Sequence, residues 1–386
     1  MQPRRADVVI IGGGVVGLSS AYHLARRGVR VMLLERDRVG QGTTSRCAGG
    51  IRQQFSTEVN IRFSQEGLRQ YQRFRDEVGE DPGLIQCGYA VLARTPEEVA
   101  LFEQNLVLQR RLGVPASLLG SAELSRLLPF VRLDGVVAGS YCATDGMADP
   151  ARVTTALARA AGRCGVEIVE QAEVVEIGVE RGAVHGVRTR SLDVAAPHVV
   201  NAAGTWAGRV ARLAGIEVPI TQARRQLYVT GPVAALPPSF PLIVDYHHGW
   251  YGRREGAGVL VSGVLRPAEG FSLAPDPGET SRALQEAEAR IPALKGAKAV
   301  RSWVGLYDNT PDNHAILGEA PEVRGLYIAA GFSGHGFMHG PAAGRVVAEL
   351  IVEGKATALD ITLLRPERFR EGRLTQEPLT MHGDRG

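Results

Sequence analysis

Two glycine-rich stretches at opposite ends of the chain each lead into a segment with helical periodicity. The first, IGGGVVG at residues 11–17, follows a short β-branched apolar run at residues 8–11 that is typical of a buried parallel strand. In a β-turn-α unit of this kind, Gly12 permits the tight turn, Gly14 lets the backbone approach a pyrophosphate, and Gly17 lets helix and strand pack closely. The helix that begins at Val15 and Val16 then presents its N-terminus to the phosphates.

An acidic residue completes this unit. A second apolar strand is predicted at residues 29–34, and Glu35 stands at its carboxyl end, where a carboxylate can accept hydrogen bonds from a ribose. Strand, glycine turn, helix, strand and terminal Glu35 in this order predict a dinucleotide site. NAD and FAD both use such a unit, so the choice between them depends on the rest of the chain.

Two further segments suit the larger flavin dinucleotide. The loop after Arg36 reads DRVGQGTTSRCAGGIRQQF, which is rich in glycine and hydroxyl residues and long for a nicotinamide domain. Further on, HVVNAAGTWA combines the end of a strand with a turn at Ala203 and Gly204 that carries little side-chain bulk. We expect a second backbone segment to approach the dinucleotide there.

Together these motifs resemble the D-amino-acid oxidase superfamily of FAD enzymes, and within it the group of sarcosine oxidase, glycine oxidase and dye-linked proline dehydrogenase. The residues that carry the resemblance are IGGGVVG with Glu35, TTSRCAGGIRQQF, NAAGTWA, TPDNHAILG and GFSGHGFMHGP, from the start of the chain to about residue 350. The resemblance implies an α/β fold with a discontinuous Rossmann-type FAD-binding domain and an α+β substrate domain built on an antiparallel sheet. We expect the FAD domain at residues 1–50, 146–214 and 306–370, the substrate domain at 51–145 and 215–305, and a frayed polar tail at 371–386.

The second glycine turn corresponds in this family to the segment against the flavin ring. We expect a strand at residues 326–330, a turn at 331–340, and Pro341 in the first turn of a helix whose positive end faces the flavin pyrimidine. The FAD-binding residues implied by the resemblance are Gly12, Gly14, Val15, Val16, Gly17, Glu35, Arg36, Thr43, Thr44, Ser45, Gly49, Gly50, Val174, Ala203, Gly204, Trp206, Gly305, Gly331, Gly334, His335, Gly336, Phe337 and Met338.

Three residues are candidates for contact with a substrate. Arg52, in AGGIRQQF, matches a carboxylate-binding arginine of sarcosine oxidases, and a guanidinium is suited to bidentate carboxylate recognition. Tyr251, in GWYGR, matches a tyrosine that faces the substrate, and His335 lies in the flavin-facing turn with His339. The alternatives are a surface or capping arginine, a tyrosine that packs in the sheet, and structural histidines.

Several other residues receive structural interpretations. His247 and His248 have neither metal-pair nor triad spacing and are expected at the rim of a pocket or on the surface. Cys47 is interpreted as a small packing residue. Asp308 and Asp312 bracket a turn and are expected to cap backbone groups that shape the loop.

The resemblance also bears on flavin attachment and on the electron acceptor. Many monomeric sarcosine oxidases carry a tethering cysteine shortly before the TPD sequence, where this chain has Gly305, so we expect noncovalent FAD. The positions of two lysines near the flavin are matched here to Val261 and Met338, which favours a dehydrogenase over an oxidase, although Arg266 or a histidine are alternative sources of positive charge. An electron-accepting partner subunit or a homo-oligomer would fit this picture.

Composition narrows the functional classes. The chain has 386 residues with 44 basic and 41 acidic side chains, which gives no reason to expect a nucleic-acid partner. Four scattered cysteines without CxxC spacing argue against a metal site and suit the cytoplasm, and no apolar run is long enough for a transmembrane segment. We therefore expect oxidation of the C–N bond of a small carboxylate-bearing amine (of sarcosine, proline, glycine or D-amino-acid type) by hydride transfer to flavin N5, giving an imine. The alternatives are an FAD-dependent hydroxy-acid or glycerol-phosphate oxidoreductase and a flavin-binding assembly factor.

Overall fold

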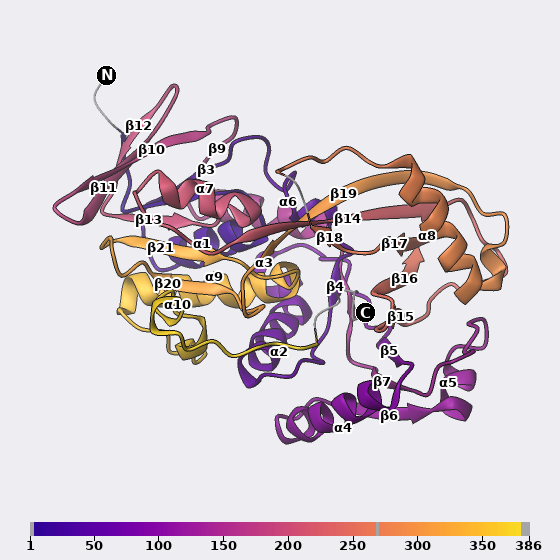
Figure 1. Ribbon diagram of the computed structural model, residues 1–386. Coiled ribbons are helices and arrows are strands. Elements are labelled where there is room, and N and C mark those ends of the chain that lie inside the picture. Colours follow the sequence, from indigo (N-terminus) through magenta and orange to yellow (C-terminus); the bar gives the residue numbers. More distant parts are fainter. Residues whose placement is uncertain (1–3, 268–269, 380–386) are drawn as a thin grey trace.

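A six-stranded sheet forms the first half of the computed structural model, which describes residues 4–267 and 270–379 (Figure 1). Five of its strands pair in parallel and one edge strand is antiparallel. Its core strands are almost entirely apolar because both faces of the sheet are covered. Across the sheet the order is β20 (Ile316–Glu319), β21 (Leu326–Ala330), β13 (His198–Asn201), β2 (Val8–Ile11), β3 (Val31–Leu34) and β9 (Glu167–Val169).

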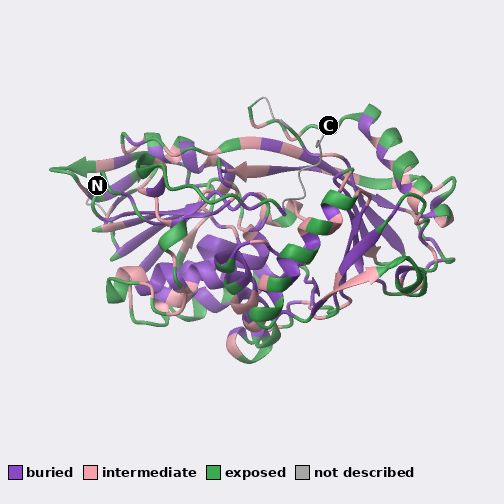
Figure 2. Cartoon of the chain, turned by 60° about the horizontal axis from the view of Figure 1, so that its bottom comes forward, coloured by how far each residue is buried: buried purple, intermediate pink, exposed green. Residues whose placement is uncertain are grey.

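A helical layer covers one face of this sheet and is largely buried in Figure 2. Its centre is the contact of α1 (Val15–Ala25) with α9 (Gly336–Glu353). A Cβ at Gly344 would lie 2.3 Å from the Ser19 Oγ, so only glycine allows this close crossing. The neighbouring helices are α2 (Glu58–Gln72), α3 (Phe74–Val78) and α6 (Pro150–Arg163). The expected domain boundaries stay a proposal, and α2, which falls within the expected substrate domain, packs against α9.

The other face of the sheet is covered by a smaller four-stranded sheet and a short helix, and the two share one apolar core. A hairpin at residues 174–189 is part of this layer. The elements are β1 (Arg4–Arg5), β10 (Val174–Glu180), β11 (Ala183–Thr189), β12 (Asp193–Ala195), the 3-10 turn η2 (Gly204–Trp206) and α7 (Ala207–Arg212).

A nine-stranded sheet lies in the second half of the molecule, and it confirms the antiparallel sheet that was expected for the substrate domain. Its only parallel pair among the described strands is β15 with β5. Both segments of the expected substrate domain contribute strands. Strands β5 to β7 lie in residues 51–145, and most of the others lie in residues 215–305. The strands are β5 (Tyr89–Ala93), β6 (Ala116–Gly120), β7 (Ala138–Cys142), β14 (Thr221–Thr230), β15 (Leu242–Asp245), β16 (Trp250–Glu255), β17 (Gly258–Ser262), β18 (Arg266–Pro267) and β19 (Ala299–Asn309).

Short elements connect or flank these layers. Helices α4 (Pro96–Arg111), α5 (Ser121–Leu127) and α8 (Pro277–Arg290) accompany the nine-stranded sheet. The remaining elements are β4 (Gly50–Ile51), β8 (Gly146–Met147), η1 (Thr44–Arg46), η3 (Pro292–Leu294), η4 (Thr362–Leu364) and α10 (Arg368–Glu371). Across the part of the chain that the structure describes, no helix combines the length and the apolar character needed to cross a membrane.

The C-terminal glycine turn is shorter than the sequence predicts. Helix α9 already begins at Gly336, so Pro341 lies inside the helix and not in its first turn. A proline there removes the donor that would normally bond to the carbonyl of Phe337. The Tyr71 hydroxyl of α2 donates to that carbonyl at 2.8 Å instead. The tertiary contact thus supplies the hydrogen bond that the proline takes away.

The prediction of a frayed tail from residue 371 is wrong at Glu377 and Leu379, although residues 371–376 are exposed. The Glu377 and Leu379 side chains are buried, and in Figure 1 the yellow segment after α10 runs past α2 towards the nine-stranded sheet. The polar composition was misleading because Glu377 is buried with hydrogen-bond donors around it.

Candidate active site

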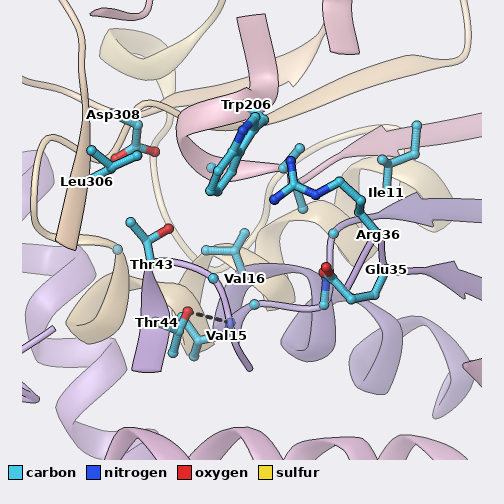
Figure 3. Close-up of a pocket in the computed structure, with 18 of the residues that line it drawn as sticks. Ile11, Val15, Val16, Glu35, Arg36, Thr43, Thr44, Trp206, Leu306 and Asp308 are labelled. Atoms are coloured by element: carbon cyan, nitrogen blue, oxygen red, sulfur yellow. Dashed lines mark hydrogen bonds between the residues drawn. The ribbon is translucent and has the colours of Figure 1, made fainter. Parts of the chain in front are cut away.

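A cavity of about 540 Å³ opens at the carboxyl ends of β2, β3 and β13, where open α/β sheets bind their ligands. Gly12 has a φ of +113°, and a Cβ there would lie 2.5 Å from the Ala202 carbonyl oxygen, so the tight turn requires glycine. The Gly13 amide donates to the Glu35 carboxylate at 2.7 Å. The Val15 amide donates to the Thr44 Oγ1 at 3.2 Å (Figure 3), which ties the loop after β3 to the start of α1.

The two ends of this cavity differ in chemistry. At one end the Arg36 guanidinium lies over the Trp206 ring, 4.4 Å from its centroid, beside Glu35 (Figure 3). At the other end the N-terminus of α9, at Gly336 and Phe337, lines the cavity. A cavity that passes two helix N-termini, with an acidic residue at one end, fits a dinucleotide whose phosphates lie at α1 and whose redox ring lies at α9.

Most residues expected to bind FAD line this cavity. They are Gly12, Gly14, Val15, Val16, Glu35, Arg36, Thr43, Thr44, Val174, Ala203, Gly204, Trp206, Gly305, Gly334, Gly336 and Phe337. The others lie elsewhere: Gly17 packs under the turn, where a Cβ would lie 2.0 Å from the Gly12 oxygen, and Ser45 lines a separate cleft. Gly331 does not line the cavity, and its amide donates at 2.8 Å to the carboxylate of Asp308, which does.

A second cavity, of about 80 Å³, adjoins the redox end of the first. Tyr251 and Phe337 line both cavities, so the two cavities share part of a wall. The three candidate catalytic residues Arg52, Tyr251 and His335 all line this second cavity. So do Gly49, Gly50 and Met338, which the sequence assigned to the flavin.

Arg52 is a buried guanidinium rather than a surface group. It is 3% exposed and stacks on the Phe55 ring, with 3.8 Å between Cζ and the ring centroid. Its Nη1 donates to the Gln54 carbonyl, and its Nη2 donates to the Leu379 carbonyl at 2.9 Å and lies 3.4 Å from the His335 Nε2. Burial lowers the pKa of the guanidinium, which nevertheless stays charged at neutral pH. The alternative of a surface arginine is wrong.

Three residues of the site were missed in the sequence. Tyr89 lines the second cavity, and Arg225 and Tyr307 line the first at its redox end. The Arg225 Cζ lies 5.0 Å from the Tyr251 ring centroid and 5.6 Å from that of Tyr307. Arg225 alternates with Ala223 and Leu227 on the inward-facing side of a strand, and an arginine at such a position is a signal that could have identified it from the sequence.

The secondary candidates agree with their structural interpretations. Asp308 accepts a hydrogen bond from a backbone amide, and burial raises the pKa of its carboxyl to about 6. Asp312 accepts from the His314 amide and forms a buried ion pair with Arg368 at 2.8 Å. His247 and His248 bond to Glu98 and Asp245 and line neither cavity. Burial raises the pKa of the Cys47 thiol to about 11, which keeps it protonated and unreactive.

The match of Val261 to a position above the flavin is wrong. Its side chain packs with Trp250 in a core on one face of the nine-stranded sheet, whereas neighbouring Leu260 packs with Tyr251 on the face of the site. Alternation along the strand decides this, because successive side chains point to opposite faces. Arg266 pairs with Glu279 at 2.9 Å, and like Val261 it lines neither cavity.

Comparisons with known proteins agree with this geometry. The model of the family DAO, described as FAD dependent oxidoreductase, matches residues 7–350. The chain is 33% identical to FAD-dependent oxidoreductase domain-containing protein 1 of Bos taurus, over 98% of this chain and 87% of that protein. It is 32% identical to mitochondrial sarcosine dehydrogenase of Homo sapiens, over 92% of this chain but 40% of that protein.

Solved structures of the same architecture include amino-acid-oxidising enzymes. The L-proline dehydrogenase of P. horikoshii superposes with a TM-score of 0.89 at 35% identity, covering 96% of this chain and 100% of that one. The glycine oxidase of Geobacillus kaustophilus gives a TM-score of 0.86 at 27% identity, with 95% and 99% covered. This chain belongs to the DAO family of FAD-dependent oxidoreductases. It is an FAD-binding oxidoreductase related to amino-acid and imino-acid dehydrogenases and oxidases.

Proposed function

We propose that this protein oxidises the C–N bond of a small amino or imino acid, of the sarcosine, proline, glycine or D-amino-acid type. The observation that carries the proposal is the buried Arg52 guanidinium in a small cavity that adjoins the redox end of the FAD cavity. A buried cation of this kind favours a ligand with a carboxylate, and the small volume favours a compact side chain. FAD, when bound, accepts the hydride that leaves the α-carbon of the substrate.

The residues around this cavity would hold the substrate in one orientation. Arg52 would bind the carboxylate, which fixes the α-carbon relative to the redox end of the first cavity. Burial raises the pKa of both Tyr89 and Tyr251, so their hydroxyls stay neutral and serve as hydrogen-bond donors. None of the described residues lining the second cavity is a carboxylate, and we propose His335 as the group that would accept the proton that the substrate amine must lose.

The same proposal covers the attachment of the FAD, the electron acceptor and the cellular location. The FAD would be held noncovalently, because Gly305 stands at the wall of the first cavity and the Cys47 thiol there is protonated. Electrons would pass to a quinone, a dye or a partner subunit more readily than to oxygen. A cytoplasmic location is likewise proposed from the free cysteines.

Anaerobic mixing of the yellow holoenzyme with a panel of compounds tests the proposed function. Sarcosine, proline, glycine and D-alanine should be compared with their neutral amides, with simple amines and with 2-hydroxy acids. We expect the flavin absorbance to bleach with at least one amino or imino acid and more slowly with its amide. Bleaching by a hydroxy acid alone would reassign the reaction to C–O oxidation, and no bleaching by any compound would favour an assembly role.

A further inference from the structure

The C-terminal strap, defined as residues 373–379, reaches from α10 to the wall of the second cavity. The Leu379 carbonyl accepts a hydrogen bond from the Arg52 Nη2 at 2.9 Å, and the Pro378 carbonyl accepts one from the Tyr246 hydroxyl at 2.9 Å. The Leu379 side chain is buried among apolar residues that include Tyr89 and Tyr251. The strap therefore covers the guanidinium that the proposed function assigns to the substrate.

Glu377 fastens the strap to the N-terminus of α2. Its carboxylate, which is inaccessible to solvent, accepts hydrogen bonds from the Ser56 amide at 3.0 Å, the Thr57 hydroxyl at 2.9 Å and the Asn60 Nδ2 at 3.1 Å. A carboxylate at a helix N-terminus is stabilised by the unpaired amides and by the helix dipole. The amide of Leu379 also donates to this carboxylate, at 3.1 Å, so the anchor and the Leu379 carbonyl are held together.

Arg52 has protein partners at both ends of its fork in this arrangement. Nη1 bonds to Gln54, whereas Nη2 bonds to Leu379 and lies 3.4 Å from the His335 Nε2. Both N–H groups of Nη2 therefore already face a partner, and a carboxylate that engages Nη2 must replace one of them. The second cavity holds about 80 Å³, well below the roughly 300–1,000 Å³ of typical small-molecule sites. A carboxylate bonds to a guanidinium more strongly than a neutral carbonyl does, which favours the exchange.

We propose that the C-terminal strap is a closure that exchanges with the substrate: the Leu379 carbonyl occupies Arg52 until an incoming carboxylate displaces it. Glu377 is the positioning residue, because its bonds to α2 set how readily the strap leaves. The inference rests on the proposed role of Arg52 in binding a carboxylate, and it adds a step that makes access to the site depend on the strap.

Hydrogen exchange on the wild-type holoenzyme tests this directly, with acetate as the probe and acetamide as the neutral control. The Glu377 amide bonds to the Asp312 carbonyl and the Leu379 amide to the Glu377 carboxylate, so both should be protected in the closed form. Saturating acetate should speed exchange in the peptide that covers residues 373–379, and acetamide should not. Exchange that is unchanged or slower with acetate would overturn the proposal.

Variants give an independent readout through the acetate dissociation constant, followed by the visible spectrum of bound flavin. Glu377→Gln and a chain shortened to end at Gly372 should bind acetate at least ~5-fold more tightly, because less of the protein is in the closed form. Glu322→Gln is the matched control, since its carboxylate is exposed and pairs with Arg370 of α10 at 3.8 Å, outside the strap. Unchanged or weaker acetate binding in both altered chains would refute the closure, and if neither retains FAD, the exchange experiment decides.

The two proposals fail in different ways. If acetate loosens the strap but no amino acid bleaches the flavin, the closure stands and the proposed reaction is wrong. If amino acids bleach the flavin while acetate leaves the strap unchanged, the reaction stands and the closure is wrong.

Discussion

Replacement of Arg52 by lysine should damage turnover of carboxylate substrates and spare turnover of neutral ones. The guanidinium is 3% exposed, donates from both nitrogens of its fork, and stacks on Phe55. A lysine keeps the charge but loses the planar fork and the stacking. Loss of the bidentate contact between a buried guanidinium and the substrate carboxylate should cost about 2–4 kcal/mol of kcat/KM. That loss is equivalent to a decrease of roughly 30- to 1,000-fold.

The comparison of an amino acid with its amide isolates the contribution of the substrate carboxylate. A neutral amide accepts a hydrogen bond from Arg52 without forming an ion pair, and a lysine can still donate one, so Arg52→Lys should change the kcat/KM of the amide by less than roughly tenfold. Anaerobic stopped-flow reduction of the flavin gives both values without involving the electron acceptor. Arg94→Lys is the matched control, because Arg94 is also largely buried and pairs with Asp245 at 3.0 Å but lines neither cavity. Equal losses for the acid and its amide, or none for either, would remove Arg52 from carboxylate recognition.

Three further predictions concern the cofactor, its reoxidation and the dependence of stability on pH. Acid precipitation should release essentially all the flavin into the supernatant, since Gly305 offers no thiol and the Cys47 thiol is protonated; flavin in the pellet would show a covalent link. Reduced enzyme should reoxidise more slowly in air-saturated buffer than with an artificial dye, because the three lysines of the chain are exposed and line neither cavity; stopped-flow reoxidation as fast as turnover would make the protein an oxidase, with Arg225 as the cation at the redox end. Burial raises the pKa of Asp145 from 3.8 to about 6, so its contribution to stability is fully present below about pH 4 and is lost as pH rises through about 6. The free energy of unfolding of Asp145→Asn, measured in urea, should therefore rise relative to that of the wild type by about 2–3 kcal/mol between pH 4 and 7. A difference that does not change with pH would contradict the raised pKa of the buried carboxyl.

The sequence was most informative where function depends on the local backbone. Gly12 must turn tightly against Ala202, and the Glu35 carboxylate at the end of β3 is fixed by the spacing of strand, turn and helix. Sixteen of the residues that the family resemblance implied for FAD binding line one cavity, and they come from segments spread from Gly12 to Phe337. The spacing of strand, turn and helix identified the first of these segments.

The start of α9 shows where local rules gave the wrong boundary. Proline favours the first turn of a helix, which placed the helix start at Pro341. In the structure the Tyr71 hydroxyl satisfies the carbonyl of Phe337, so the helix tolerates the proline and begins at Gly336. Tyr71 is far away in the sequence, and no local pattern could have revealed its contact.

The sequence by itself determined the family, the cofactor and the antiparallel sheet, because each leaves a motif or an alternation of side chains. The tertiary structure decided what surrounds the substrate. It brought Arg52, His335 and Tyr251 to one cavity, added Arg225 to the adjoining wall, and placed Leu379 on Arg52. These contacts join segments that are hundreds of residues apart, and their energies depend on burial and on hydrogen-bond partners that exist only once the chain has folded.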